Sequence, residues 1–365
     1  MRISHDPMSD THIDDDVRAA IADITAHGPI DHEEEEDVSQ LFAALTREEV
    51  CNCIFSSWYP NFRHSTIKSE IIKPLDPTFI EYLLEDGIVL PHDDIPQYSC
   101  RIEDPESSGG EWSDNEEEAS VTIDISHTSD EIRRRIALLG DRVMPRMCWS
   151  APKDASWMAM GNSLACRSPS EIYVLLKSSD KISGDLLHGR YLPKEQLGAI
   201  EHELVLREWS NLIPSMEFRC FVKGKKLVGI SQIDYEYYEF LEGMRDEIEA
   251  KLQGFFAHVR DKFPSDNYCY DAYIAQTVDR VYVIDFEPWT PSVDSCLFEW
   301  RELAKPDAEY LGLRLFPKGV DAMGHFSGKY SKNRFPLEAT DEQFRGSMAE
   351  LIKSVAAQTQ KQQKE

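Results

Sequence analysis

The segment NYCYDAYIAQTVDRVYVIDFEPW, residues 267–289, contains two largely apolar runs on either side of the polar residues TVDR. This pattern predicts two antiparallel strands joined by a turn. On the second strand Asp285 and Glu287 are two residues apart, so their side chains leave the same face of the sheet. A turn centred on Val278 would place Asp271 directly opposite Asp285, at about 4.5–5.5 Å.

The three carboxylates of this hairpin would then converge on one spot, and their charge has to be balanced. Like charges at such distances repel one another unless a cation lies among them. Carboxylate oxygens suit magnesium, which takes its remaining ligands from waters and nucleotide phosphates. From these residues alone, a magnesium site formed by Asp271, Asp285 and Glu287 and a solvated, charged hairpin face have equal weight.

Two cationic side chains are candidates for binding phosphates. Arg219 lies in EFRCFV and faces opposite to Phe218 and Cys220. An arginine inside a sheet needs an anionic partner, although simple exposure is the commoner explanation. Lys177 ends the apolar run EIYVLLK, which we expect to be a strand; a lysine there is usually solvated but can reach a phosphate. With the three acids, these cations predict a nucleotide–magnesium site.

The composition disfavours several classes of protein. The 365 residues include 39 basic and 66 acidic ones, giving a net charge of −27, so we expect no direct nucleic-acid partner. No stretch approaches the roughly 20 apolar residues of a membrane span, and the N-terminus has no secretory signal, which predicts a cytoplasmic protein. The eight cysteines lack zinc-site spacing and indicate reduced, buried thiols. The chain has no P-loop, dinucleotide-binding or protein-kinase motif.

Helical and strand patterns intermix along the chain and predict an α+β fold with mostly antiparallel strands. Helices are expected at 76–86, at 129–141 with Ser129 as the cap, and at 239–263, with a short one within 37–50. Strands are expected at GIVLP, RVMPRMCW, SWMAM, EIYVLLK, HELVLREW, EFRCFV, KLVGISQI, NYCYDAYIA and RVYVIDF.

Shifts in composition predict four segments. Residues 1–46 are acid-rich and nearly free of aromatics, which is typical of a disordered extension. An N-terminal lobe is expected at 47–206, with an acidic insertion near 101–120. A second lobe is expected at 207–330, and a C-terminal segment with a polar tail at 331–365.

A set of strings in fixed order carries a resemblance to a known family. They are FSSWYPNF…TIKS…LP (55–91), WSAPKDASWMAM (149–160), LLKSSD (175–180), HELVLREW (202–209), IPSMEFRCFV (213–222), LVGISQIDYEYY (227–238) and VIDFEPW (283–289). Together they resemble the cell division cycle protein 123 family over residues 51–300. The resemblance implies an ATP-grasp-like fold with ATP and Mg²⁺ between two lobes. It also implies a monomeric assembly chaperone that binds the gamma subunit of eukaryotic translation initiation factor 2.

The resemblance also implies roles for individual residues. Asp271, Asp285 and Glu287 match the metal ligands, Arg219 matches an arginine beside the phosphates, and Lys177 matches the lysine near the nucleotide. The backbone of LVLREW would meet the adenine, and WSAPKDASW would cover the phosphates. The remaining positions expected to contact ATP are Arg146, Trp149, Ala151, Arg207, Trp209 and Asp234.

Two departures from the family pattern concern charge. Arg146 stands where the family usually has lysine, and a forked guanidinium is not equivalent to an ammonium. Glu287 stands where asparagine is common, which adds a negative charge to the proposed metal site.

Two functions remain open from the sequence. A non-catalytic ATP-binding chaperone is favoured, and the alternative is an ATP-grasp ligase that forms an acyl phosphate on a carboxylate substrate. The aromatic stretch Trp58–Phe62 is a candidate docking surface, with core packing the commoner explanation.

Overall fold

The computed structural model describes residues 38–88, 90, 123–159, 163–275, 280–305 and 309–319. The chain separates into two units after Gln40, and apart from Val38–Gln40 everything described here belongs to the second, Leu41–Glu365. The expectations for residues 1–37, for the insertion near 101–120 and for 331–365 lie outside the described residues. The expected strand GIVLP is not present: Gly87, Ile88 and Leu90 are described and lie outside any strand, and its other two residues lie outside the described ranges.

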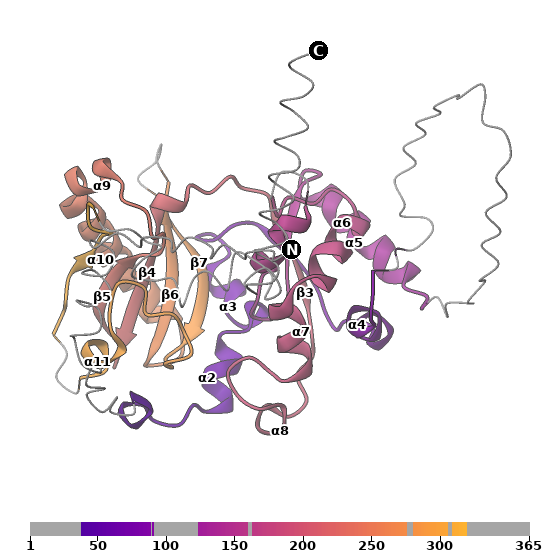
Figure 1. Ribbon diagram of the computed structural model, residues 1–365, viewed down its shortest axis with the longest axis horizontal. Helices are drawn as coiled ribbons and strands as arrows, with labels where there is room; N and C mark the ends of the chain where they lie inside the picture. Colours follow the sequence, from indigo (N-terminus) through magenta and orange to yellow (C-terminus); the bar gives the residue numbers. More distant parts are fainter. Residues whose placement is uncertain are drawn as a thin grey trace, which may run out of the picture. The chain divides into compact units, whose positions relative to one another are not determined.

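The larger sheet has five strands in the order β7-β6-β4-β5-β8, antiparallel except for the β5–β8 pair. Helix α10 contacts β5 and β7, and its buried residues Ile248, Leu252 and Phe256 join the sheet in one hydrophobic core (Figure 1). The bounds are β4 Glu217–Lys223, β5 Lys226–Gln232, β6 Tyr268–Ile274, β7 Val281–Pro288, β8 Leu313–Arg314, α9 Glu239–Gly243, α10 Arg245–Lys262 and α11 Trp300–Leu303.

The smaller sheet has three antiparallel strands in the order β1-β3-β2. Helices α4, α5, α6 and α7 pack against one another beside it and enclose a second core (Figure 1). The bounds are β1 Ser69–Ile72, β2 Val143–Arg146, β3 Leu204–Glu208, α4 Pro77–Leu84, α5 Ser126–Leu138, α6 Pro169–Lys177 and α7 Asp180–Leu187.

The remaining described elements are short. They are η1 Val38–Leu41, α2 Arg47–Asn52, α3 Phe55–Phe62, η3 Lys153–Met158, α8 Lys194–Leu197 and η5 Pro214–Met216. Within the described part of the chain, no helix combines the length and the apolar character needed to cross a bilayer. The seven described cysteines are all free and six are buried, as expected; Cys100 lies outside these ranges.

Helix α3 belongs to the core of the larger sheet, although it precedes both sheets in sequence. The ring centroid of Phe286 on β7 lies 5.2 Å from Trp58 and 5.1 Å from Phe62. Both side chains are 1% exposed, so core packing, the commoner explanation for this aromatic stretch, is confirmed for them, and they do not form a docking surface. The expected lobe 47–206 therefore does not coincide with one hydrophobic core.

Two of the expected strands are helical. EIYVLLK lies in α6, which begins at Pro169 and is capped by Ser168, whose hydroxyl accepts from the Glu171 amide. Ile172, Tyr173, Leu175 and Leu176 are all buried, so the helix is apolar on more than one side. Its sequence therefore has the continuous apolar run that is also typical of a buried strand. SWMAM lies largely in η3.

Helix boundaries also differ from expectation. The predicted helix 239–263 is two helices, α9 and α10, separated at Met244. Helix α5 begins three residues before Ser129, whose hydroxyl lies 2.7 Å from the Tyr173 hydroxyl rather than capping the helix. The helix at 76–86 is confirmed as α4, with Asp76 accepting from the Thr78 amide at its N-terminus.

Candidate functional site

The predicted carboxylate hairpin is present, with Asp271 on β6 directly opposite Asp285 on β7. The register shifts just beyond this pair, so that Ala272 faces Val283 and Ile284 is the extra residue of a β-bulge. The predicted pairing of Asp271 with Asp285 is confirmed. It depends on the bulge, because the residue pairs nearer the turn follow a register that is offset by one residue.

Arg219 binds two of the three acids. Strand β4 pairs with β6 so that Arg219 stands opposite Asp271, and its Nε and Nη2 donate to the two Asp271 oxygens at 2.8 and 2.9 Å. Its Nη1 lies 3.2 Å from a Glu287 oxygen. Such two-pronged pairs are among the stronger charge-assisted hydrogen bonds, so the arginine predicted to need an anionic partner has two.

Arg146, from the smaller sheet, contacts the third acid, Asp285. It ends β2, is 1% exposed, and its Nη2 lies 3.0 Å from Asp285 Oδ1. The same nitrogen donates to the Trp149 carbonyl at 2.6 Å, and the guanidinium lies 5.2 Å from the Phe55 ring centroid. The site is therefore built from both sheets.

Arg190 is a member of the site that sequence reasoning missed. It follows α7, and its Nη2 lies 3.4 Å from Glu287 while Nη1 donates to the Ser150 hydroxyl at 2.6 Å. It lies outside any periodic element, so no local pattern distinguishes it from a surface arginine. The arginine–carboxylate cluster consists of Arg146, Arg190, Arg219, Asp271, Asp285 and Glu287.

The acids of the cluster have pKa values shifted in opposite directions. Burial raises the pKa of Asp285, and Arg146 only partly opposes this shift. Burial also acts to raise the pKa of Glu287, but Arg219, Arg190 and two nearby lysines outweigh it and lower the pKa. Glu217, a half-buried acid at the start of β4 that the sequence did not point to, has a pKa raised by burial. Glu287 is therefore more firmly ionised than Asp285.

The carboxylate oxygens of Asp271, Asp285 and Glu287 are of the type that magnesium prefers, but the three side chains are not arranged around a common point as metal ligands would be. Within the described residues, no group of three or more His, Cys, Asp or Glu side chains is placed to hold a metal ion. Instead, guanidinium groups bind all three carboxylates. Binding of Mg²⁺ by Asp271, Asp285 and Glu287 would require these arginines to exchange partners.

Other predicted site residues lie near the cluster in different roles. Trp149 is 5% exposed, and its indole donates to the Val50 carbonyl at 3.2 Å, so its ring is part of the core. Ala151 lies in the loop before η3, where its carbonyl accepts from the Lys153 amide. Asp234 accepts from the Tyr238 hydroxyl at 2.6 Å.

Lys177 lies at the end of a helix rather than of a strand. Its ammonium donates to the carbonyls of Tyr82 and Glu85, the latter at 2.9 Å, and so satisfies the C-terminal end of α4. A role beside the nucleotide stays a prediction and would require this ammonium to leave those carbonyls.

The backbone expected to meet adenine is already paired. Strand β3 is central in its sheet, so Arg207 has neighbours on both sides. The Glu208 amide donates to the Lys68 carbonyl at 2.8 Å, and the Trp209 amide to the Arg142 carbonyl at 2.9 Å. The Arg207 guanidinium points inward and donates to the Ile284 carbonyl at 3.0 Å, and burial lowers its pKa to about 10. Contact with adenine stays a prediction.

Comparison with known proteins gives consistent matches. The family model described as D123 matches residues 58–343. The cell division cycle protein 123 of Yarrowia lipolytica is 35% identical over 326 residues, covering 85% of this chain and 84% of that protein. A protein of Sclerotinia sclerotiorum named translation initiation factor eIF2 assembly protein is 38% identical, covering 74% of this chain and 68% of its own. The solved structure of Cdc123 from Schizosaccharomyces pombe has a TM-score of 0.61 and 34% identity, covering 76% of this chain and 100% of that one.

Proposed function

The chain belongs to the D123 family, and from that premise we propose that it is an ATP- and magnesium-binding assembly factor for translation initiation factor eIF2. Relatives 37–38% identical to it carry the name eIF2 assembly protein. The more specific part of the proposal is that the chain binds the gamma subunit, acts in the cytoplasm and holds Mg–ATP without needing to turn it over.

The arginine–carboxylate cluster carries this proposal. Three guanidiniums and three carboxylates neutralise one another in a largely buried place, which is costly unless the geometry is good. A triphosphate can replace the carboxylates as partner of Arg146, Arg190 and Arg219, because arginine binds phosphate oxygens with the same fork. The released carboxylates are then available to a cation.

Magnesium would complete the exchange. Asp271, Asp285 and Glu287 would hold the ion, which supplies a divalent charge against the phosphate oxygens. This chain's own strands do the rest, because β6 and β7 keep the three acids on one face of the sheet.

The position of the cluster suggests how nucleotide binding supports assembly. Arg146 comes from the smaller sheet, whereas Arg219 and the acids come from the larger one. A ligand that contacts both sheets stabilises the arrangement in which it binds, by mass action. The net charge of −27 favours a partner surface with basic patches.

The binding test uses calorimetry with the full chain. Wild type should bind Mg–ATP, Arg219→Met should lose at least about a hundredfold in affinity, and Arg190→Met about tenfold, since each removes charge-assisted contacts. Arg260→Met is the matched control: Arg260 forms an exposed ion pair with its neighbour Asp261, so its loss should leave ATP affinity unchanged. Wild-type affinity in folded Arg190→Met and Arg219→Met would refute the site.

The assembly test uses capture of purified eIF2 subunits on the immobilised chain. We expect retention of the gamma subunit to increase with Mg–ATP and to decrease in Arg190→Met. ADP release measured in the same samples separates a scaffold, which releases little, from an ATP-consuming ligase. No difference in subunit retention with and without Mg–ATP, at saturating nucleotide, would contradict the proposed role of ATP.

A further inference from the structure

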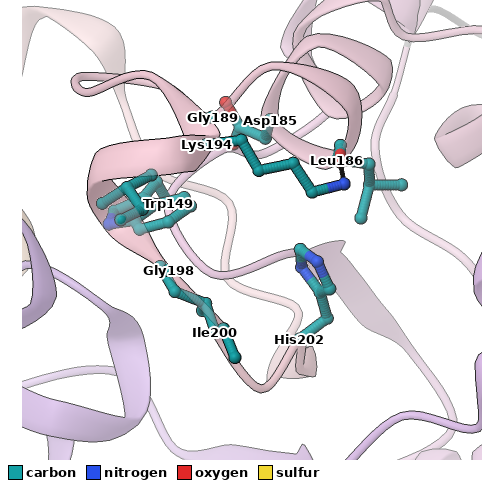
Figure 2. A pocket seen from close by; sticks show the side chains of 10 residues that line it. Trp149, Asp185, Leu186, Gly189, Lys194, Gly198, Ile200 and His202 are labelled. Carbon is teal, nitrogen blue, oxygen red and sulfur yellow. Dashed lines mark hydrogen bonds between the residues drawn. The ribbon is translucent and has the colours of Figure 1, made fainter.

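A cavity of about 130 Å³ lies beside the arginine–carboxylate cluster, between α7, α8 and the chain leading into β3. Figure 2 shows the Lys194 side chain running along one wall, with its ammonium next to Leu186 and the His202 ring near it. The lining residues are Trp149, Asp185, Leu186, Gly189, Lys194, Leu197, Gly198, Ala199, Ile200 and His202.

Asp185 is the unsatisfied group of this cavity. It is 7% exposed, and its Oδ2 atom has no hydrogen-bond partner within the described part of the chain. Burial raises the pKa of this carboxyl, and Arg190 and hydrogen bonds from the Ser150 hydroxyl and amide oppose the shift. A buried carboxylate oxygen without a partner is costly, so this atom calls for a donor, best a cationic one.

Lys194 lines the same cavity with the opposite charge. It is exposed, and its ammonium lies 3.4 Å from the Leu186 carbonyl, at the long end of hydrogen-bond distance. Trp149, Leu186 and Leu197 add apolar surface to the lining. Burial, and Lys194 after it, lower the pKa of His202, so the imidazole is neutral at neutral pH.

We propose that this cavity binds a small zwitterion, with a protonated primary amine on Asp185 and an anionic group on Lys194 at the mouth. The volume fits such a ligand, since a cavity of about 150 Å³ accommodates a benzene-sized molecule. A lining that combines one acid, one amine and apolar side chains is expected of a site that orients a small charged ligand. This inference does not depend on the proposed binding of ATP.

The site touches the cluster through one residue. The Ser150 hydroxyl bonds Asp185 on one side and accepts from Arg190 on the other, and Arg190 contacts Glu287. Asp185 is therefore a binding residue of the cavity that also helps to position the loop beside Arg190.

The test is calorimetric titration of the full chain with 4-aminobutanoate, compared with butylamine and butanoate, which each lack one charge. We expect saturable binding of 4-aminobutanoate and at least about tenfold weaker binding of butanoate, since it loses the charge-assisted bond to Asp185. Butylamine should bind about threefold more weakly, because the contact with exposed Lys194 is screened.

Variants assign the site. Asp185→Asn should lose at least about tenfold in affinity for 4-aminobutanoate, and Lys194→Met about threefold. Glu195→Gln is the matched control: it is an exposed charge on the same short helix and outside the lining, so affinity should not change. Circular dichroism checks that Asp185→Asn folds; if it does not, Lys194→Met and the butanoate comparison still decide.

Two results would overturn the proposal. One is the absence of saturable 4-aminobutanoate binding up to roughly 20 mM, which would leave the cavity to water. The other is unchanged affinity for 4-aminobutanoate in a folded Asp185→Asn variant. If that variant does not fold, the same conclusion follows from unchanged affinity in Lys194→Met combined with equal binding of butanoate. Either result would place the ligand elsewhere on the chain.

Discussion

The residues of the arginine–carboxylate cluster depend on one another. Arg146 is almost completely buried, and its ion pair with Asp285 provides a counter-charge inside the protein. If Asp285 only faced a cleft, a substitution there would be expected to leave the fold intact. With Arg146 as a buried partner that expectation changes, since removing one member leaves the other charge uncompensated.

Asp285→Asn should therefore lower stability as well as Mg–ATP binding. We expect a loss of about 2–3 kcal/mol in the free energy of unfolding, below the usual cost of breaking a fully buried pair because Asp285 is 21% exposed. Urea denaturation measures it. Asp261→Asn, which removes the acid of an exposed pair with Arg260, is the control and should cost little. Unchanged stability in Asp285→Asn would show that the pair contributes nothing.

Glu287 gives a pH-dependent prediction. Its folded-state pKa lies below the ordinary value of 4.5: burial opposes the shift, but Arg219, Arg190 and the nearby lysines outweigh it. A lowered carboxyl pKa contributes stability that is complete above about pH 4.5 and is lost as the pH falls through the folded-state pKa. Wild type should exceed Glu287→Gln in stability at pH 6, and the difference should shrink below pH 4.5. A difference that grows on acidification would contradict this sign.

At the scale of elements, the central strands were predicted, whereas β1, β8 and several helices were not. The strands β3 to β7 follow alternation or apolar runs bounded by turns, and all were expected. Helix α6 was not, because it is buried on several sides and a short apolar run has no clear period. Its Ser168–Pro169 start was the available signal, since this pair is typical of a helix N-terminus.

Lys177 tests the new assignment of α6. Its ammonium bonds two carbonyls at the end of α4, so Lys177→Met should lower the free energy of unfolding by about 1 kcal/mol. Lys226→Met, at an exposed strand end, is the matched control. Thermal and urea unfolding give the stability, and calorimetry gives ATP affinity. Weakened ATP binding without loss of stability would favour the phosphate contact instead of the helix contact.

At the scale of the whole molecule, β7 connects the two sheets. The Thr66 hydroxyl, just before β1, donates to the Val283 carbonyl at 2.7 Å, and the Val283 amide donates to the Ser65 carbonyl at 2.8 Å. Arg207 on β3 donates to the Ile284 carbonyl. These contacts and the arginine–carboxylate cluster lie on the same strand, so movement of one sheet relative to the other would disturb the cluster.

Thr66→Val should therefore destabilise the whole molecule. The substitution keeps the shape but leaves the Val283 carbonyl without its hydroxyl donor, at a cost of about 1–3 kcal/mol in the free energy of unfolding. Thr66→Ser keeps the hydroxyl and should cost less. Denaturation followed by both tryptophan fluorescence and far-UV circular dichroism checks the value, and coincident transitions indicate that both sheets unfold together. Equal stabilities of the Val and Ser variants would contradict the link.

Local backbone geometry was enough to anticipate part of this molecule. Side chains alternate along a strand, so residues 267–289 already put Asp285 and Glu287 on one face. The pairing of Asp285 with Asp271 depends in addition on the β-bulge at Ile284. Packing between distant segments settled the rest. Arg146 and Arg190 lie 139 and 97 positions from the acids they bind (285 − 146 and 287 − 190), and no local rule connects such positions. Which charges meet depends on how two sheets and their helices fill space together, and that arrangement emerges only when the whole core has formed.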